Sequence, residues 1–249
     1  MALGIKLARA AIVVAIFALW EALSRSGTVN PRLLPAASDT LAMLGQLLQR
    51  ASVRNDLAVT ASEVLTAFAL AVPFGALVGF LIAENRYFAE VVKPLLFFAF
   101  SIPKSIFLPM FILVFGVGFA QKVGFGFFST IFIVIMSTTT AVEQVKVEYL
   151  TVARSYGATS AQTALRVYLP SMLPVLLEAP RISMIFNLTG VILAEMYASR
   201  DGIGHQIASW GENFQMKQLL AGVVMIATIA IAFNEAVRWV ETRCSHWRT

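Results

Sequence analysis

Six long apolar segments alternate with shorter polar ones along the chain, and this alternation dominates the sequence. A helix needs about 20 mostly apolar residues to cross the ~30 Å hydrocarbon core of a membrane. The pattern therefore predicts an all-α membrane protein with about six transmembrane helices, in a single domain over residues 1–249. The predicted spans are residues 7–23, 57–83, 92–120, 123–142, 182–199 and 218–234.

The first apolar segment also has features of a cleaved signal peptide. Basic residues precede it, and Ala22-Leu23-Ser24 is a small-x-small sequence. Trp20 and Glu21 make a poor cleavage region, however, and removal of this segment would put the longest polar insert on the wrong side of the membrane. We therefore predict that residues 7–23 remain as the first span.

That insert, residues 143–170, is much longer than a turn between two spans requires. Val145, Tyr149 and Tyr156, together with Val152 or Ala153, repeat at helical spacing. The repeat predicts a helix with one apolar face.

The end of this helix is marked by Gly157, which can adopt a positive φ and reverse the chain. Thr159 or Ser160 can cap a second short helix through about Val167. Leu169-Pro170 is expected to end it. We call the predicted helix–glycine–helix projection, residues 143–170, the knuckle.

Small residues recur in the second span, where one stands at every fourth position: Ala67, Ala71, Gly75, Gly79 and Ala83. Lipid gives helices no hydrophobic reason to associate, so close contacts rely on small side chains. The ridge predicts a tight helix–helix seam, and ordinary small-residue content is the alternative.

A second stripe follows one narrow arc of the fifth span: Ser183, Asn187, Gly190, Ala194 and Ala198. An amide that faces lipid is costly, so we predict that this arc lines a translocation pathway or a subunit seam. Glu195 lies roughly 100° round from the arc. Two interpretations stay open for Glu195: a position near the exit of a wet path, or an ion pair with a cation such as Arg200.

The third span is interrupted by Pro103, Lys104 and Pro109. Broken helices at membrane depth line a cavity or lie against protein. The break therefore predicts Ser101 and Lys104 as pathway residues. For Lys104, snorkelling or neutralisation by a nearby carboxylate is the alternative.

The connection over residues 25–56 is predicted to lie outside the membrane. Ser38 or Asp39 can cap a short amphipathic helix over residues 40–50. Its apolar face consists of Leu41, Leu44, Leu47 and Leu48. This pattern is typical of an interfacial helix that lies on the membrane.

Composition agrees with a polytopic membrane protein, since 58% of the residues are hydrophobic and only 13% are charged. The net charge of +5 does not indicate nucleic-acid binding, because the basic residues are scattered singly between apolar runs. With the long connection 25–56 set aside, Lys and Arg concentrate on the side that holds both termini and the knuckle, which predicts a cytoplasmic location for all three. One cysteine and two histidines argue against a disulfide or a metal centre.

Around the knuckle the chain resembles the inner-membrane permease subunits of binding-protein-dependent ABC importers, particularly the nitrate, sulfonate and taurine class. The motif of that family reads Glu-Ala-Ala, three residues, Gly, nine residues, Ile, one residue, Leu-Pro. Residues at those spacings here are Ala153, Gly157, Val167, Leu169 and Pro170. Further segments similar in order and spacing are Leu33-Leu34-Pro35, Ser101-Ile102-Pro103, Pro109, Phe115-Gly116, Ala194-Glu195 and Asp201-Gly202-Ile203-Gly204.

One departure concerns the opening Glu-Ala of the motif, which is Thr151-Val152 in this chain. In the family that glutamate helps to seat the coupling helix against the ATPase. Glu148, nearly one turn earlier, is the nearest acid and the expected substitute.

The resemblance implies a permease subunit in the bacterial cytoplasmic (inner) membrane, transporting a small organic or inorganic anion such as a sulfonate or nitrate. It implies ABC ATPase subunits, which carry ATP and Mg, an extracytoplasmic solute-binding protein, and a second permease copy, with a homodimer expected. We expect the two copies to pair through their small-residue helices. The coupling residues that it implies are Glu148, Thr151, Ala153, Tyr156, Gly157, Ala158, Leu169 and Pro170.

Other classes of function fit the sequence less well. No glycine is followed by lysine, so the chain lacks the phosphate-binding loop of ATPases. The energy for its function must therefore come from another source. An ion-coupled carrier would need intramembrane acids, and only Glu63 and Glu195 qualify. An intramembrane enzyme lacks a catalytic cluster. The same importer type for a neutral heterocycle or a vitamin precursor stays open.

Overall fold

The computed structural model describes residues 2–30 and 32–244, apart from the side chains of residues 2, 3, 6, 173–175, 177, 178 and 240–244. Within these residues the regular elements are helical, which confirms the all-α prediction. They are α1 (Ala2–Arg25), α2 (Ala37–Gln49), α3 (Ala51–Glu84), α4 (Arg86–Ser101), the 3₁₀ turn η1 (Lys104–Phe107), α5 (Leu108–Phe115), α6 (Phe119–Glu143), α7 (Val147–Ser155), α8 (Ser160–Thr163), the π-helical turn η2 (Ala164–Tyr168), α9 (Leu169–Tyr197), α10 (Ile203–Glu212) and α11 (Met216–Cys244).

Four described helices are long and apolar enough to cross a membrane, namely α1, α3, α6 and α11. The pair α4 and η1–α5 passes the same test together, with a bend of 80° at the predicted break. The structure thus supports four or five spans directly. The remaining predicted span lies in α9, which carries Arg181, Asn187 and Glu195 within its length and is not among these helices.

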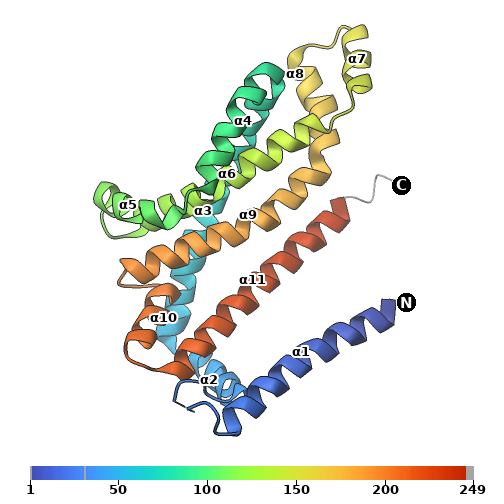
Figure 1. Cartoon of the computed structure of the whole chain (residues 1–249). Helices are drawn as coiled ribbons and strands as arrows, with labels where there is room; N and C mark the ends of the chain where they lie inside the picture. The colour runs from blue at the N-terminus through green and yellow to red at the C-terminus, as the bar shows by residue number, and fades with distance from the viewer. Residues whose placement is uncertain (1, 31, 245–249) are drawn as a thin grey trace.

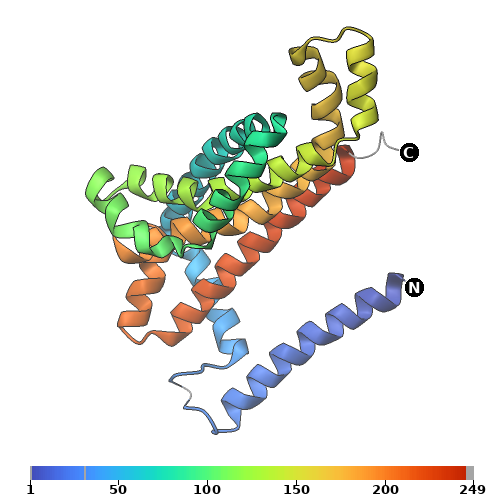
Figure 2. The same ribbon diagram turned by 45° about the horizontal axis from the view of Figure 1, so that its top comes forward.

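The elements are arranged with the knuckle at one end of the molecule and α2 and α10 at the other, which we call the distal end (Figure 1). Helix α1 stands apart from the bundle in both views (Figures 1 and 2) and joins it mainly through α2. Trp20 Nε1 of α1 donates to Pro35 O at 2.9 Å, and Ser24 Oγ donates to Leu34 O at 2.7 Å. These bonds hold the distal end of α1, whereas its remaining length presents apolar side chains outward.

Helix α6 packs along both α3 and α9 and forms the centre of the bundle. The small-residue ridge of α3 faces α6, which confirms the predicted seam. A Cβ atom at Gly75 would lie 2.9 Å from Val134 Cβ, and one at Gly79 would lie 2.7 Å from Ile135 O. Side chains cannot be accommodated at those distances, so the two backbones touch only because these residues are glycine.

On its other side α6 meets α9 just as closely. A Cβ atom at Gly190 would lie 2.6 Å from Ser129 Oγ, and one at Gly126 would lie 2.6 Å from Val191 Cγ2. Both small-residue stripes are therefore occupied by contacts within one chain. The expectation that two copies pair through these helices is wrong, because α6 already covers them.

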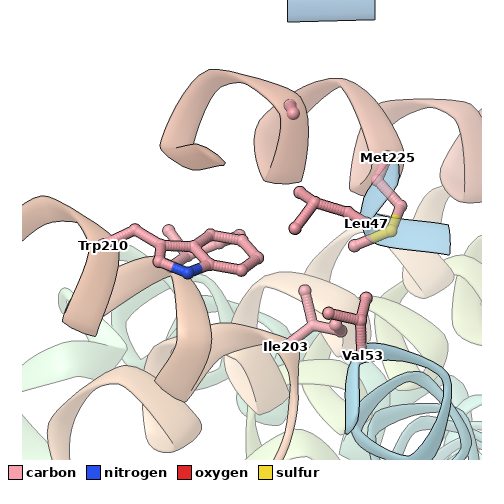
Figure 3. Close-up of a cluster of buried hydrophobic side chains, with 7 residues drawn as sticks. Leu47, Val53, Ile203, Trp210 and Met225 are labelled. Atoms are coloured by element: carbon pink, nitrogen blue, oxygen red, sulfur yellow. The ribbon is translucent and has the colours of Figure 1, made fainter. Parts of the chain in front are cut away.

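The distal end has a hydrophobic core of its own, shared by α2, α3, α10 and α11 (Figure 3). Leu47 and Ile203 are fully buried there, with Trp210 and Met225 beside them. Helix α2 therefore packs against protein through Leu47, whereas Leu41 and Leu48 are exposed. The predicted cap is wrong: α2 begins after Ala36, and neither Ser38 nor Asp39 caps it, because both lie inside the first turn.

The backbone contact at Gly79 generates a stability prediction. We expect Gly79→Ala to lower the free energy of unfolding by about 1–3 kcal/mol, because the added methyl group is forced against the carbonyl oxygen of Ile135. Gly45→Ala in α2 is the matched control, since nothing lies within 4 Å of its added Cβ. That control should be neutral or slightly stabilising in a helix. Equal thermal unfolding temperatures of the two purified variants would contradict the close contact of α3 with α6 at Gly79.

Candidate functional site

The first helix of the knuckle, α7, ends as predicted at Gly157, whose φ is +69°. The Gly157 N–H donates to Arg154 O at 2.9 Å, and the Ala158 N–H donates to Ala153 O at 3.0 Å. This pair of bonds is the Schellman pattern, in which a glycine in the left-handed region closes a helix. A glycine is needed here because L side chains rarely adopt this conformation.

The second helix begins at the predicted cap Thr159. Its Oγ1 accepts the Gln162 N–H at 3.3 Å, while Gln162 Oε1 accepts the Thr159 N–H at 2.9 Å, so that a complete capping box is present. The expectation that Leu169-Pro170 ends this helix is wrong. Helix α8 continues through the π-helical turn η2 into α9, and the Leu169 N–H donates to Ala164 O. The wider turn lets the chain pass Pro170, which has no N–H of its own, without a break.

The base of the knuckle is packed against the bundle. Val145 is buried in a cluster with Ala141, Val142 and Met172, and Leu150 and Val167 pack against that cluster. The ring of Tyr168 meets that of Phe80 on α3 edge-to-face, with centroids 5.5 Å apart. Lys93 of α4 forms an ion pair with Glu143 at the end of α6. The knuckle is therefore held by α3, α4, α6 and α9 together.

The tip of the knuckle presents large apolar side chains to its surroundings. Tyr156 is 88% exposed and Val152 is 55% exposed, and Tyr149 and Leu165 are exposed as well. Glu148 and Thr151 are exposed on the same helix, and Thr151 Oγ1 donates locally to Val147 O. Exposed apolar patches with polar rims mark interaction surfaces. Of the predicted apolar face, Tyr149, Val152 and Tyr156 are thus uncovered within the described part of the chain, whereas Val145 is buried at the base of the knuckle.

At the break of the third predicted span, Ser101 is exposed and its hydroxyl donates to Phe97 O. Lys104 Nζ donates to Phe100 O at 2.7 Å and lies 4.1 Å from the centre of the Phe100 ring. Its partners are therefore a carbonyl group and an aromatic face. Lys104 stabilises the carboxyl end of α4, as a cation does at a helix C-terminus.

The arc that contains Ser183, Asn187 and Gly190 faces α3 and α6 of the same chain. Ser183 and Asn187 are fully buried, and the Ser183 hydroxyl donates to Pro180 O. With its amide oriented to match its neighbours, Asn187 donates to Val64 O at 3.2 Å and accepts from Thr130 Oγ1 at 3.3 Å. In this conformation the arc joins helices within the chain, and these side chains are covered.

Glu195 is fully buried at the distal end of α9. Its Oε1 accepts the Thr60 hydroxyl at 2.6 Å, and its Oε2 accepts the Gly204 N–H at 2.7 Å. Thr60 Oγ1 in turn accepts the Ile203 N–H at 2.9 Å. Among the described residues Glu195 therefore bonds to Thr60 and α10, and not to Arg200.

A buried ion pair lies beside Glu195, and sequence reasoning missed it. Lys122, only 2% exposed, is 2.6 Å from Glu63 Oε1 and 2.7 Å from Asp201 Oδ1. The hydrogen bond from Lys122 holds the pKa of Asp201, in the α9–α10 connection, below its ordinary value. The sequence did contain one indication of this pair. Glu63 is the single acid in an otherwise apolar span, and a buried carboxylate needs a cation.

Asp56 completes this distal network. Its Oδ1 accepts the Gly202 N–H at 3.0 Å, and its Oδ2 accepts from Gln206 Nε2 at 2.8 Å. The first three N–H groups of the α10 region, on Gly202, Ile203 and Gly204, are thus all bound by side chains of α3 and α9. Carboxylates at a helix N-terminus are stabilising, so this arrangement fixes the start of α10 on α3.

Comparison with known proteins supports the family resemblance found in the sequence. The chain is 26% identical over 237 residues to the taurine transport system permease protein TauC of Escherichia coli K12, covering 93% of this chain and 86% of TauC. It is 24% identical over 233 residues to the putative aliphatic sulfonates transport permease protein SsuC of Bacillus subtilis 168, covering 94% and 84%.

Among solved structures, a chain of the inward-facing MetNI methionine ABC transporter is similar in fold. The TM-score is 0.65 at 19% identity, over 81% of this chain and 97% of the other. A family described as the inner membrane component of binding-protein-dependent transport systems matches residues 42–246. The match covers the knuckle, the seam and the distal network. The chain therefore belongs to this family, as a non-catalytic permease subunit of an ABC importer whose ATP is hydrolysed by a separate ATPase.

Proposed function

We propose that the chain forms, with a second copy, the pathway by which an ABC importer takes up a small organic sulfonate or a related anion. The observation that carries this proposal is the likeness to TauC and SsuC over more than nine-tenths of the chain. Taurine and aliphatic sulfonates share an anionic sulfonate group, so the shared chemistry is recognition of that group.

In the proposed topology α9 is the remaining span, which gives six. The knuckle and both chain ends lie in the cytoplasm of the bacterial inner membrane, and the distal end faces outward. The common direction of the knuckle, the start of α1 and the described end of α11 in Figure 1 supports this topology. The bias of Lys and Arg toward that side supports it as well. The connections over residues 25–56 and 200–217 would then receive solute from the binding protein.

The knuckle is the proposed docking surface for the ATPase, which holds ATP and Mg. Its contact residues would be Tyr156, Gly157 and Ala158 at the tip, with Glu148, Thr151 and Ala153 on α7. The uncovered apolar side chains of the tip support this role, because a partner would remove them from water. Leu169 and Pro170 would pass the movement of the ATPase into α9, since η2 joins the two helices without a break.

For the solute, we propose a path along the broken segment α4–η1–α5, at Ser101 and Lys104. Among the described residues Lys104 has no carboxylate partner, so its charge is available to attract an anion. The apolar side chains that α4 and α5 expose would face the second copy and lipid. Ser183, Asn187, Gly190 and Glu195 would hold the helices that border this path.

Uptake by purified components tests the proposed function. The chain, its ATPase and its binding protein are reconstituted in lipid vesicles, and uptake of taurine and a short alkyl sulfonate is measured. We expect ATP-dependent uptake of sulfonates that exceeds uptake of a neutral heterocycle of similar size. Uptake by the chain alone, driven by a proton gradient, would contradict the permease role, whereas preference for the neutral solute would contradict only the substrate.

Gly157 provides a test of the knuckle. Gly157→Val should abolish ATP-driven uptake while leaving membrane insertion intact, because a side chain in the left-handed region costs about 1–2 kcal/mol and distorts the tip. Gly157→Asn is the matched control and should retain most uptake, since asparagine tolerates this conformation. Normal uptake by the valine variant would refute the assignment of this turn to coupling.

The missing glutamate of the motif gives a further prediction. Glu148 and Thr151 lie three residues apart on α7, so their side chains are neighbours on one face. Glu148→Ala should weaken co-purification with the ATPase more than Thr151→Ala does, and Thr151→Glu should be tolerated. The proposal that Glu148 replaces the missing glutamate is wrong if Glu148→Ala co-purifies as the unmodified protein does and Thr151→Ala does not.

A further inference from the structure

The buried network at the distal end contains more negative than positive charge. Glu63 is 1% exposed and Glu195 is fully buried, and Lys122 is the cation that contacts Glu63. Lys122 is shared with Asp201, whose side chain is 54% exposed and is therefore also stabilised by water. If every carboxyl group were ionised, one ammonium group would face three carboxylates. A buried carboxylate without a matching cation is strongly disfavoured.

The hydrogen bonds identify where the excess charge lies. Glu195 uses both oxygens as acceptors, from Thr60 and from the Gly204 N–H. Glu63 Oε1 meets Lys122, but Glu63 Oε2 is buried and has no donor among the described residues. Glu63 follows Thr60 by about one turn of α3, and the Thr60 hydroxyl bonds to Glu195 Oε1, so the carboxyl groups of Glu63 and Glu195 are neighbours. A hydrogen bond between them would give Glu63 Oε2 a partner. Two carboxylates cannot bond in this way, because neither has a hydrogen to donate.

We propose that Glu63 and Glu195 share one proton, and that this proton holds the α9–α10 connection closed on α3. The proton gives Glu63 Oε2 its missing partner and leaves one negative charge between the two groups, which Lys122 balances. Glu195 also contacts the backbone at Gly202, where an added Cβ would collide with its carboxyl group. The pair is thus directly beneath the connection that it holds.

The remaining charged groups around the pair are accounted for. Helix α3 contributes Asp56, whose two oxygens are bound by the Gly202 N–H and by Gln206. Helix α6 contributes Lys122, the α9–α10 connection contributes Asp201, and α10 contributes His205. The charge interaction with His205 helps to lower the pKa of Asp201. The described residues contain no group of three or more His, Cys, Asp and Glu side chains that could hold a metal ion.

Loss of the proton would place two carboxylates in contact. Their repulsion would be relieved by movement of Glu195, which would release the Gly204 N–H and, through Thr60, the Ile203 N–H. The shared proton makes the closure of the α9–α10 connection on α3 depend on pH, whatever solute the protein carries. Failure of the substrate proposal would leave it unaffected, since it concerns only residues of this chain.

The direct test is infrared spectroscopy of the purified full-length protein in lipid discs at neutral pH. We expect a carbonyl band of a protonated carboxylic acid that disappears as the pH is raised. Glu195→Gln should lack the band, whereas Asp39→Asn, which alters the exposed ion pair with Lys217, should keep it. No such band in the unmodified protein, or its persistence in Glu195→Gln, would overturn the proposal.

Stability and hydrogen exchange provide the second readout. The folded protein would hold one proton more than the unfolded chain, so its folding equilibrium should fall by about tenfold per pH unit above the ordinary glutamate range of about pH 4.3, until the pair ionises. Deuterium uptake at Gly202–Gly204 should rise over the same pH range, relative to Glu195→Gln at each pH. If Glu195→Gln does not fold, the infrared band and the deuterium exchange of the unmodified protein still test the proposal. A band and an exchange rate that both stay constant with pH would refute the shared proton.

Discussion

The structure depends on the close contact of α6 with two helices at once. Glycines bring the backbones of α3 and α6 together on one side, at Gly75 and Gly79, and those of α6 and α9 on the other, at Gly126 and Gly190. In a membrane such contacts have no hydrophobic driving force, so shape complementarity and buried hydrogen bonds must hold them. Asn187 provides such bonds between α9, α3 and α6. The three helices therefore form one closely packed core.

Both ends for which we propose a function are attached to this core. The knuckle grows from the ends of α6 and α9 and is fixed at its base by Tyr168 and Val145, so force applied at its tip reaches both helices. At the distal end, α10 is bound through its first N–H groups to α3 and α9. Continuous packing thus connects the surface proposed for the ATPase to the surface proposed for the binding protein. That arrangement suits alternating access, which requires gating and no covalent chemistry.

Much of this follows from the sequence because the membrane restricts the choices. Apolar length predicted the helices, and the break at Pro103 and the turn at Gly157 were found because proline and glycine act locally. The helix through Pro170 was missed, since a π-helical turn depends on packing that local preferences do not contain. The partner of the small-residue ridge could not be identified either, because a seam within a chain and one between chains have the same pattern. The ion pair of Lys122 with Glu63 was missed because only the fold brings these two residues together.

The central claim is that the two ends meet different soluble partners, and thiol labelling tests it most directly. Tyr156→Cys at the knuckle tip and Phe214→Cys at the distal end, each in a Cys244→Ser background, replace side chains that are 88% and 76% exposed. Addition of the ATPase should protect Tyr156→Cys from a membrane-impermeant thiol reagent and leave Phe214→Cys labelled. Protection of Phe214→Cys by the ATPase, with Tyr156→Cys still labelled, would contradict the account.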